Sequence, residues 1–275
     1  MSTITVPEPI PSPEEDSQRL KKAFEGWGTD EKAIIDILGQ RTAVQRRHIA
    51  AAYQTLFNES LLQRLHDELS GDFRNAVILW ATDPVERDAK LANEALIWVI
   101  IEISCASSPD HLMAVRQAYC SLFTSSLEED ILRKFLERLV SSYRYDGEHV
   151  DEELANSEAA KLYDALVIRI LGIRSRSQLK ATFKHYKQRY GKAFDEFISM
   201  LRTAVWCIDS PERHFAEVVR TSVMGLGTDE DLLTRAIVTR AEIDMKKIKE
   251  EYYKTTLVIG DTSGYYKDFL LTLVG

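Results

Sequence analysis

The stretch GWGTDE at residues 26–31 returns almost unchanged as GLGTDE at residues 225–230. Two glycines one residue apart permit backbone conformations that other residues avoid, so several carbonyl oxygens can turn outward together. The threonine of each stretch is placed to cap a helix, and the carboxylates that follow suit the positive end of that helix dipole. Converging carbonyls suit a hard cation such as Ca2+, which also takes bidentate carboxylates. One copy would more often be a plain turn before a capped helix, but two copies at equivalent places predict a repeated cation site.

The composition describes a folded, acidic protein. The chain has 275 residues, of which 45% are hydrophobic and 28% are charged, as in ordinary globular proteins. Its net charge of -8 argues against a nucleic-acid partner, and no run of Lys or Arg reverses that charge locally. An acidic chain can still reach an anionic membrane, provided that a cation lies between the two.

Cysteine usage and hydropathy indicate the compartment. Cys105, Cys120 and Cys207 are odd in number and far apart, so we expect no disulfide framework. The N-terminal residues have neither the basic segment nor the apolar core of a signal peptide. The longest apolar run, residues 95–101, is too short to span a bilayer. We therefore expect a cytoplasmic protein.

Almost all of the chain after the first dozen residues reads as amphipathic helix. Those first residues carry four prolines and predict an extended arm, which ends at a capping box, Ser12-Pro13-Glu14-Glu15. Apolar residues then recur at helical spacing, for example Ala33, Ile34, Ile37 and Leu38. No stretch combines alternating polarity with hairpin turn residues. The sequence predicts an all-α fold.

Internal repeats predict the architecture. An arginine stands twelve residues before a tyrosine at 41 and 53, at 174 and 186, and at 240 and 252. A fourth copy, at 107 and 119, has serine in place of the arginine. Homologous helical units must bury their apolar faces against one another, as repeat arrays do. The predicted divisions are an arm (1–12) and four repeats (13–83, 84–145, 146–209 and 210–275).

The chain resembles the annexins, and most closely the plant annexins, from about Ser12 to Gly275. The resemblance rests on the two GxGTDE stretches and on DPVERDAKLANEAL (83–96), RQAYCSLFTSSLEED (116–130), SSYRYDGEHV (141–150) and TRAEID (239–244). It implies four repeats of about five helices each in a slightly curved disc, with calcium-binding loops on the convex face.

The resemblance also implies a ligand set, in which Ca2+ takes three carbonyls of the Gly-rich turn and a carboxylate about forty residues later. In the first repeat these are the carbonyls of Phe24, Gly26 and Gly28 and the carboxylate of Glu68. In the fourth repeat they are the carbonyls of Val223, Gly225 and Gly227 and the carboxylate of Asp261. The second and third repeats lack the GxGT turn, so we expect no site of this type there.

The repeats differ in length where the family has its convex-face loops. Tyr53 and Gly71 are 18 residues apart, whereas Tyr252 and Gly264 are 12 apart. Either these loops are shorter in this protein, or the sequence omits some of their residues. The unbroken register of the flanking helices favours omission, in which case Asp261 can still reach its turn.

Other residues have a bland and a functional interpretation. Trp27 and Leu226 stand at the tips of the two turns, where an apolar residue could enter the headgroup zone or pack on a neighbouring loop. Ile168-Arg169-Ile170 matches an element linked in plant annexins to binding of F-actin, although core packing with an exposed Arg is the commoner reason for such a pattern. Cys105 and Cys207 match a cysteine pair of plant annexins that is credited with redox sensitivity, but buried cysteines need no such role.

An enzyme is the rival from another class. The resemblance raises peroxidase activity, yet the position of the histidine credited with it is Gln40 here. It also raises nucleotide hydrolysis through a DxxG element, which residues 261–264 fit, but no GxxxxGK[ST] phosphate loop accompanies them. No GxSxG signature is present. Turnover that survived in a Glu68→Ala, Asp261→Ala double variant would favour an enzyme.

We therefore expect a non-enzymatic protein that binds acidic phospholipid membranes peripherally when calcium is present. The ion would be shared between protein oxygens and lipid phosphate. A calcium-independent scaffold for F-actin is the remaining alternative, and it predicts filament binding that ignores a chelator but is lost in Arg169→Glu. The sequence does not indicate the oligomeric state.

Overall fold

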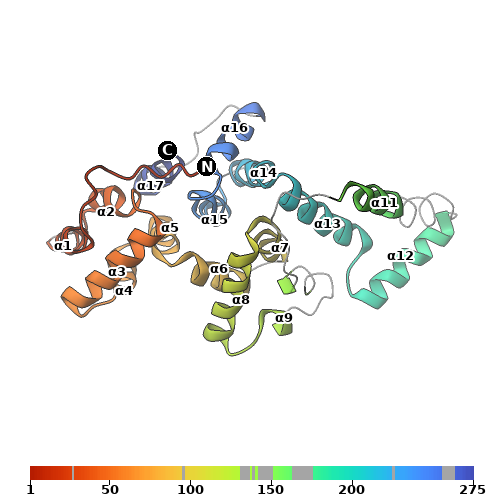
Figure 1. The fold of residues 1–275 in the computed structure, drawn as a ribbon, viewed down its shortest axis with the longest axis horizontal. Helices are drawn as coiled ribbons and strands as arrows, with labels where there is room; N and C mark the ends of the chain where they lie inside the picture. The colour runs from red at the N-terminus through yellow and green to blue at the C-terminus, as the bar shows by residue number, and fades with distance from the viewer. Residues whose placement is uncertain are drawn as a thin grey trace.

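The computed structural model describes the chain except residues 27, 95–96, 131–136, 138–139, 142–150, 163–175, 225–226 and 256–263. The described residues form helices joined by turns, with no β-strand among them. The predicted all-α fold is confirmed (Figure 1).

The helices follow the predicted repeats along the chain. The predicted first repeat holds five helices: α1 (Pro13–Ala23), α2 (Glu31–Leu38), α3 (Ala43–Phe57), α4 (Leu61–Glu68) and α5 (Gly71–Ala81). The middle of the chain holds α6 (Pro84–Glu94), α7 (Ile97–Ala106), α8 (Pro109–Phe123), α9 (Leu127–Asp130), α11 (Glu152–Leu162), α12 (Arg176–Tyr190) and α13 (Phe194–Asp209). The predicted fourth repeat holds α14 (Pro211–Val223), α15 (Glu230–Arg240), α16 (Met245–Thr255) and α17 (Gly264–Val274).

Local sequence explains where these helices begin. The predicted capping box at Ser12 is present: its hydroxyl accepts from the Glu15 amide, and the Glu15 carboxylate accepts from the Ser12 amide. Thr42 and Gln45 form a second capping box at the start of α3. Pro13 and Pro211 occupy first-turn positions, where their missing N–H group costs no hydrogen bond.

The repeated tyrosines are core residues. Tyr53, Tyr119 and Tyr252 are all buried, although they lie in three different predicted repeats. Arg41, of the first Arg–Tyr pair, is buried too, and its guanidinium binds the Asp16 carboxylate at 2.7 and 3.0 Å. The spacing that reveals the repeats in the sequence is therefore a spacing of packed residues.

The described helices share two cores, and the first joins the two ends of the chain. Its buried residues come from the predicted first and fourth repeats, where α5 packs against α15 and α17, and α17 also packs against α2. The second core combines residues 89–140 with Met200 and Ala204 of α13, which packs against α7. Figure 1 shows the N- and C-termini close together above the first core.

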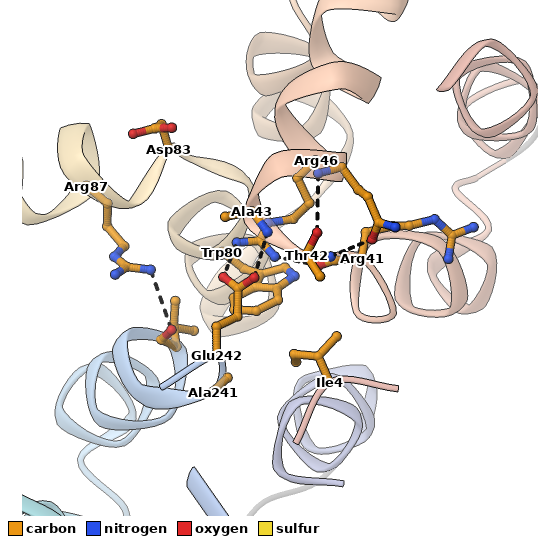
Figure 2. Close-up of polar contacts among 12 residues, drawn as sticks. Ile4, Arg41, Thr42, Ala43, Arg46, Trp80, Asp83, Arg87, Ala241 and Glu242 are labelled. Atoms are coloured by element: carbon orange, nitrogen blue, oxygen red, sulfur yellow. Dashed lines mark hydrogen bonds and ion pairs between the residues drawn. The ribbon is translucent and has the colours of Figure 1, made fainter. Parts of the chain in front are cut away.

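A buried ion pair ties the predicted first repeat to the fourth. Glu242 follows α15, and its carboxylate accepts from the Arg46 guanidinium at 2.9 Å and from the Ala43 amide at 2.6 Å. The Arg46 guanidinium also lies 3.5 Å from the ring centroid of Trp80, whose indole N–H donates to the Leu38 carbonyl at 2.8 Å (Figure 2). Burial lowers the pKa of Arg46 to about 10, an effect that the Glu242 carboxylate opposes.

The predicted extended arm lies along the fourth repeat. The Thr3 amide donates to the Ala241 carbonyl at 3.1 Å, and its hydroxyl donates to the Leu273 carbonyl at 2.5 Å. Ile4 packs against the first core. The arm thus adds a further contact at the place where the two ends of the chain meet.

Removing Glu242 should weaken the contact between the two ends of the chain. We expect Glu242→Ala to lower the free energy of unfolding by about 3 kcal/mol, because it leaves the buried Arg46 charge and the Ala43 amide unpaired. Urea unfolding followed by circular dichroism measures the change. Glu158→Ala, at an exposed position of α11, is the control and should stay within about 0.5 kcal/mol of the parent protein. An equally small effect of Glu242→Ala would contradict the prediction.

Candidate functional site

The first Gly-rich turn connects α1 to α2 and needs its two glycines. Gly26 has φ +116° and Gly28 has φ +91°, a region that residues with a Cβ rarely adopt. A Cβ at either position would meet nothing within 4 Å, so backbone conformation rather than space requires glycine there. The Asp30 amide closes the turn by donating to the Ala23 carbonyl at 2.9 Å.

The helix cap differs from the sequence prediction. The N-cap of α2 is Asp30, whose carboxylate accepts from the Ala33 amide at 3.0 Å. Thr29, which was expected to cap the helix, stands one residue too early because the turn closes at Asp30. Its hydroxyl instead lies 3.0 Å from Oε2 of Glu68 and 3.3 Å from the Glu68 carbonyl.

Glu68 is brought to the turn by helix packing. It is the last residue of α4, a short helix that packs against α3 and α5. The contact with Thr29 joins residues 39 positions apart in the sequence. The structure thus brings the predicted carboxylate to the predicted turn in the first repeat.

Arg64 is the residue of this site that the sequence analysis missed. Its Nη2 lies 2.8 Å from Oε1 of Glu68 and donates to the Phe24 carbonyl at 3.3 Å. Both oxygens belong to predicted calcium ligands. The signal was present, because Arg64 precedes Glu68 by four residues on one helix and such pairs face each other.

A second ion pair lies beside Arg64. The Glu59 carboxylate is 3.0 Å from the Lys21 ammonium and 3.6 Å from the Arg64 guanidinium. The hydrogen bond from Lys21 lowers the pKa of Glu59, so this carboxylate stays ionised. The Tyr53 hydroxyl donates to it at 3.4 Å, and burial raises the pKa of Tyr53 to about 12.

The turn of the predicted fourth repeat has the same frame. Its Asp229 amide donates to the Ser222 carbonyl at 2.7 Å, its Asp229 carboxylate caps α15, and Gly227 has φ +111°. Here too the cap is the aspartate and not the preceding threonine. Val223 ends α14 directly before the turn. Gly225, Leu226 and Asp261 lie outside the described residues.

The other predicted functional residues fall in different places. Trp27, at the tip of the first turn, and the Ile168-Arg169-Ile170 element lie outside the described residues. Cys207 is buried, and Cys105 is half-buried. Burial, and then the nearby Glu102 charge, raise the pKa of the Cys207 thiol. A raised pKa keeps a thiol protonated and therefore less reactive.

The donor set of the first turn fits a hard cation. It consists of backbone carbonyls and one carboxylate, which are oxygen ligands of the kind that Ca2+ takes. Within the part of the chain that the structure describes, no three His, Cys, Asp or Glu side chains converge as a side-chain metal cage would. The guanidinium of Arg64 shows that the carboxylate and the Phe24 carbonyl already attract a positive charge.

The fold and its two Gly-rich turns define a class, that of all-helical repeat proteins with carbonyl-rich turns between helices. The annexin family model matches residues 15–80, 157–200 and 214–273. The chain is 49% identical to Annexin D3 of Arabidopsis thaliana, in an alignment that covers 100% of this chain and 99% of the relative. The chain belongs to the annexin family and is of the plant type.

Solved structures agree with this assignment. The structure of annexin III matches with a TM-score of 0.85 and 31% identity, over 100% of this chain and 97% of the other. A calcium-bound annexin (Sm)1 matches with a TM-score of 0.75 and 28% identity, over 96% and 90% of the two chains.

The alignment with Annexin D3 bears on the shortened loops. It spans 318 positions, 43 more than the 275 residues of this chain. The chain therefore has fewer residues than its relative between the matched segments, as the unequal repeat lengths predict. Among the described helices, none is long and apolar enough to cross a bilayer.

Buried tyrosines should make the fold sensitive to alkaline pH. Burial raises the pKa values of Tyr53 and Tyr266 to about 12, whereas an unfolded tyrosine titrates near pH 10. The folded state holds these protons more tightly, so their contribution is complete below about pH 10 and is lost as the pH rises to about 12. We expect the free energy of unfolding to fall over this range, and to fall less in Tyr53→Phe. Urea unfolding at stepped pH measures this, with the exposed Tyr253→Phe as control; equal slopes in all three proteins would contradict the expectation.

Proposed function

We propose that this chain binds acidic phospholipid membranes through calcium ions held at the turns of its first and fourth repeats. Membership of the annexin family and the fold support calcium-dependent phospholipid binding in general. The particular turns and ligands are our proposal. The observation that carries it is the contact between Thr29 and Glu68, which brings a carboxylate to a Gly-rich turn.

In the first repeat the ion would be held by the carbonyls of Phe24, Gly26 and Gly28 and by both oxygens of Glu68. The two positive φ angles support this set, because they let alternate carbonyls turn to one side of the chain. These ligands leave part of the calcium coordination shell open, and a lipid phosphate oxygen fills it. Neither partner completes the site alone, so we expect weak calcium binding without lipid.

The fourth repeat would hold a second ion by the carbonyls of Val223, Gly225 and Gly227 and the carboxylate of Asp261. The shared frame of the two turns supports this assignment, since the Asp229 cap and the Gly227 conformation match those of the first turn. The division of the chain into an arm and four repeats at the predicted boundaries stays a prediction.

Electrostatics explains why calcium is needed. The chain carries a net charge of -8, so an anionic bilayer repels it. A divalent cation between carboxylate and phosphate reverses the sign of the contact where the two surfaces meet. Trp27 and Leu226 would then enter the headgroup zone beside the bound ions. The protein would be cytoplasmic and would move to the membrane surface when calcium rises.

The remaining alternatives stay predictions. Annexins are not enzymes in general, and we assign this chain no catalytic residues. Binding of F-actin through Ile168, Arg169 and Ile170 and a redox role for Cys105 and Cys207 are not needed for the proposed function. The raised pKa of the Cys207 thiol argues against that residue as the reactive member of the pair.

Co-sedimentation with phosphatidylserine vesicles tests the proposal. We expect the chain to pellet with vesicles in calcium and to stay in the supernatant with a chelator. Glu68→Gln removes the carboxylate charge but keeps the shape of the side chain, so the calcium concentration needed for half-maximal pelleting should rise by about tenfold.

The exposed control Glu158→Gln should pellet like the parent chain. If Glu68→Gln also pelleted like the parent, the site in the first repeat would be wrong. If no protein pelleted at any calcium concentration, the proposed membrane function would be wrong as a whole.

A further inference from the structure

The Arg64 side chain lies among the ligands of the proposed calcium site. A single nitrogen, Nη2, contacts both Oε1 of Glu68, at 2.8 Å, and the Phe24 carbonyl, at 3.3 Å. Calcium bound to these oxygens would lie 2.3–2.6 Å from each of them, roughly in the space that this nitrogen takes. The other carboxylate oxygen, Oε2, is 3.0 Å from the Thr29 hydroxyl.

Two positive charges cannot share this space. Calcium carries two charges and the guanidinium one, and their repulsion in the partly shielded site exceeds that between groups in open water. The guanidinium also occupies one of the two oxygens that a bidentate carboxylate must offer the ion. Calcium can therefore take its full ligand set only after the guanidinium has moved away.

A second carboxylate stands ready to receive the displaced guanidinium. Glu59 precedes α4, and its Oε1 is 3.6 Å from Nη1 of Arg64. A small rotation of the side chain would exchange Glu68 for Glu59. The Arg64 side chain also lies over the Phe24 ring, 5.8 Å from its centroid, which keeps it close to the turn.

We propose that Arg64 is an affinity-determining residue, a tethered cation that competes with calcium for Glu68 and the Phe24 carbonyl. Without calcium, it holds the carboxylate against the turn and neutralises it. When calcium binds, the guanidinium moves to Glu59, and this exchange reduces the calcium affinity of the first repeat. The inference rests on the proposed ligand set, because it requires Glu68 to be a ligand.

The fourth repeat offers a natural contrast in the sequence. The residue four positions before Asp261, which corresponds to Arg64 before Glu68, is Leu257. A leucine cannot compete with a cation. The two proposed sites should therefore differ in affinity, with the first repeat the weaker one.

Calcium titration calorimetry without lipid tests the inference on the full chain. All proteins carry Asp261→Asn, so that the proposed site of the fourth repeat is silent. Arg64→Gln removes the charge, and Arg64→Leu introduces the residue found in the fourth repeat while keeping an apolar contact with Phe24. We expect both to lower the calcium Kd by roughly fivefold, the upper range for an exposed ion pair.

The matched control is Arg213→Gln, which removes one positive charge from an exposed side chain of α14. Its Kd should change by less than about twofold, because only long-range charge is altered. An Arg64 variant with an unchanged or raised Kd would overturn the inference, since the arginine would then be neutral or supporting.

A further variant separates this failure from failure of the proposed function. Glu68→Gln in the same background should abolish the calorimetric signal of the first repeat. If that signal disappears while the Arg64 variants bind like the parent, the site stands and the competition is wrong. If Glu68→Gln leaves calcium binding unchanged, both the site and the competition are wrong.

Discussion

The structure depends on the contact between the two ends of the chain. The predicted first and fourth repeats share one core, and the Arg46–Glu242 pair beside Trp80 ties them together. A small bundle of short amphipathic helices has an apolar face that it cannot bury alone. Burying the first repeat against the fourth fixes α2 and α15, the helices that follow the two Gly-rich turns, in a single packed body.

Within that body, the first turn is shaped by backbone geometry and the carboxylate is supplied by packing. Gly26 and Gly28 adopt conformations that only glycine adopts readily, and the Asp30 amide closes the turn on Ala23. Glu68 reaches the turn because α4 ends there, against α3 and α5. The ligand set is thus assembled from a local constraint and a tertiary one, and its net negative charge already attracts the Arg64 guanidinium.

The sequence predicted the parts of this account that depend on local pattern. Helical periodicity, the capping box at Ser12 and the repeated Arg–Tyr spacing led to the all-α fold, and the annexin resemblance led to Glu68. Thr29 was assigned the wrong role, because the residue at which the turn closes depends on its folded geometry. The pairing of the first core with the fourth repeat was out of reach, since periodicity does not say which apolar faces meet. Arg64 could have been found from its position four residues before Glu68, but its contact with the Phe24 carbonyl required the fold.

The central claim is that calcium binds between the first Gly-rich turn and Glu68, and anomalous diffraction from crystals grown with calcium tests it most directly. The account predicts an anomalous peak within about 2.3–2.6 Å of the carbonyls of Phe24, Gly26 and Gly28 and of both Glu68 oxygens. It also predicts that the Arg64 guanidinium has left the Phe24 carbonyl. Crystals with calcium bound elsewhere, and with Arg64 still between Glu68 and Phe24, would contradict it.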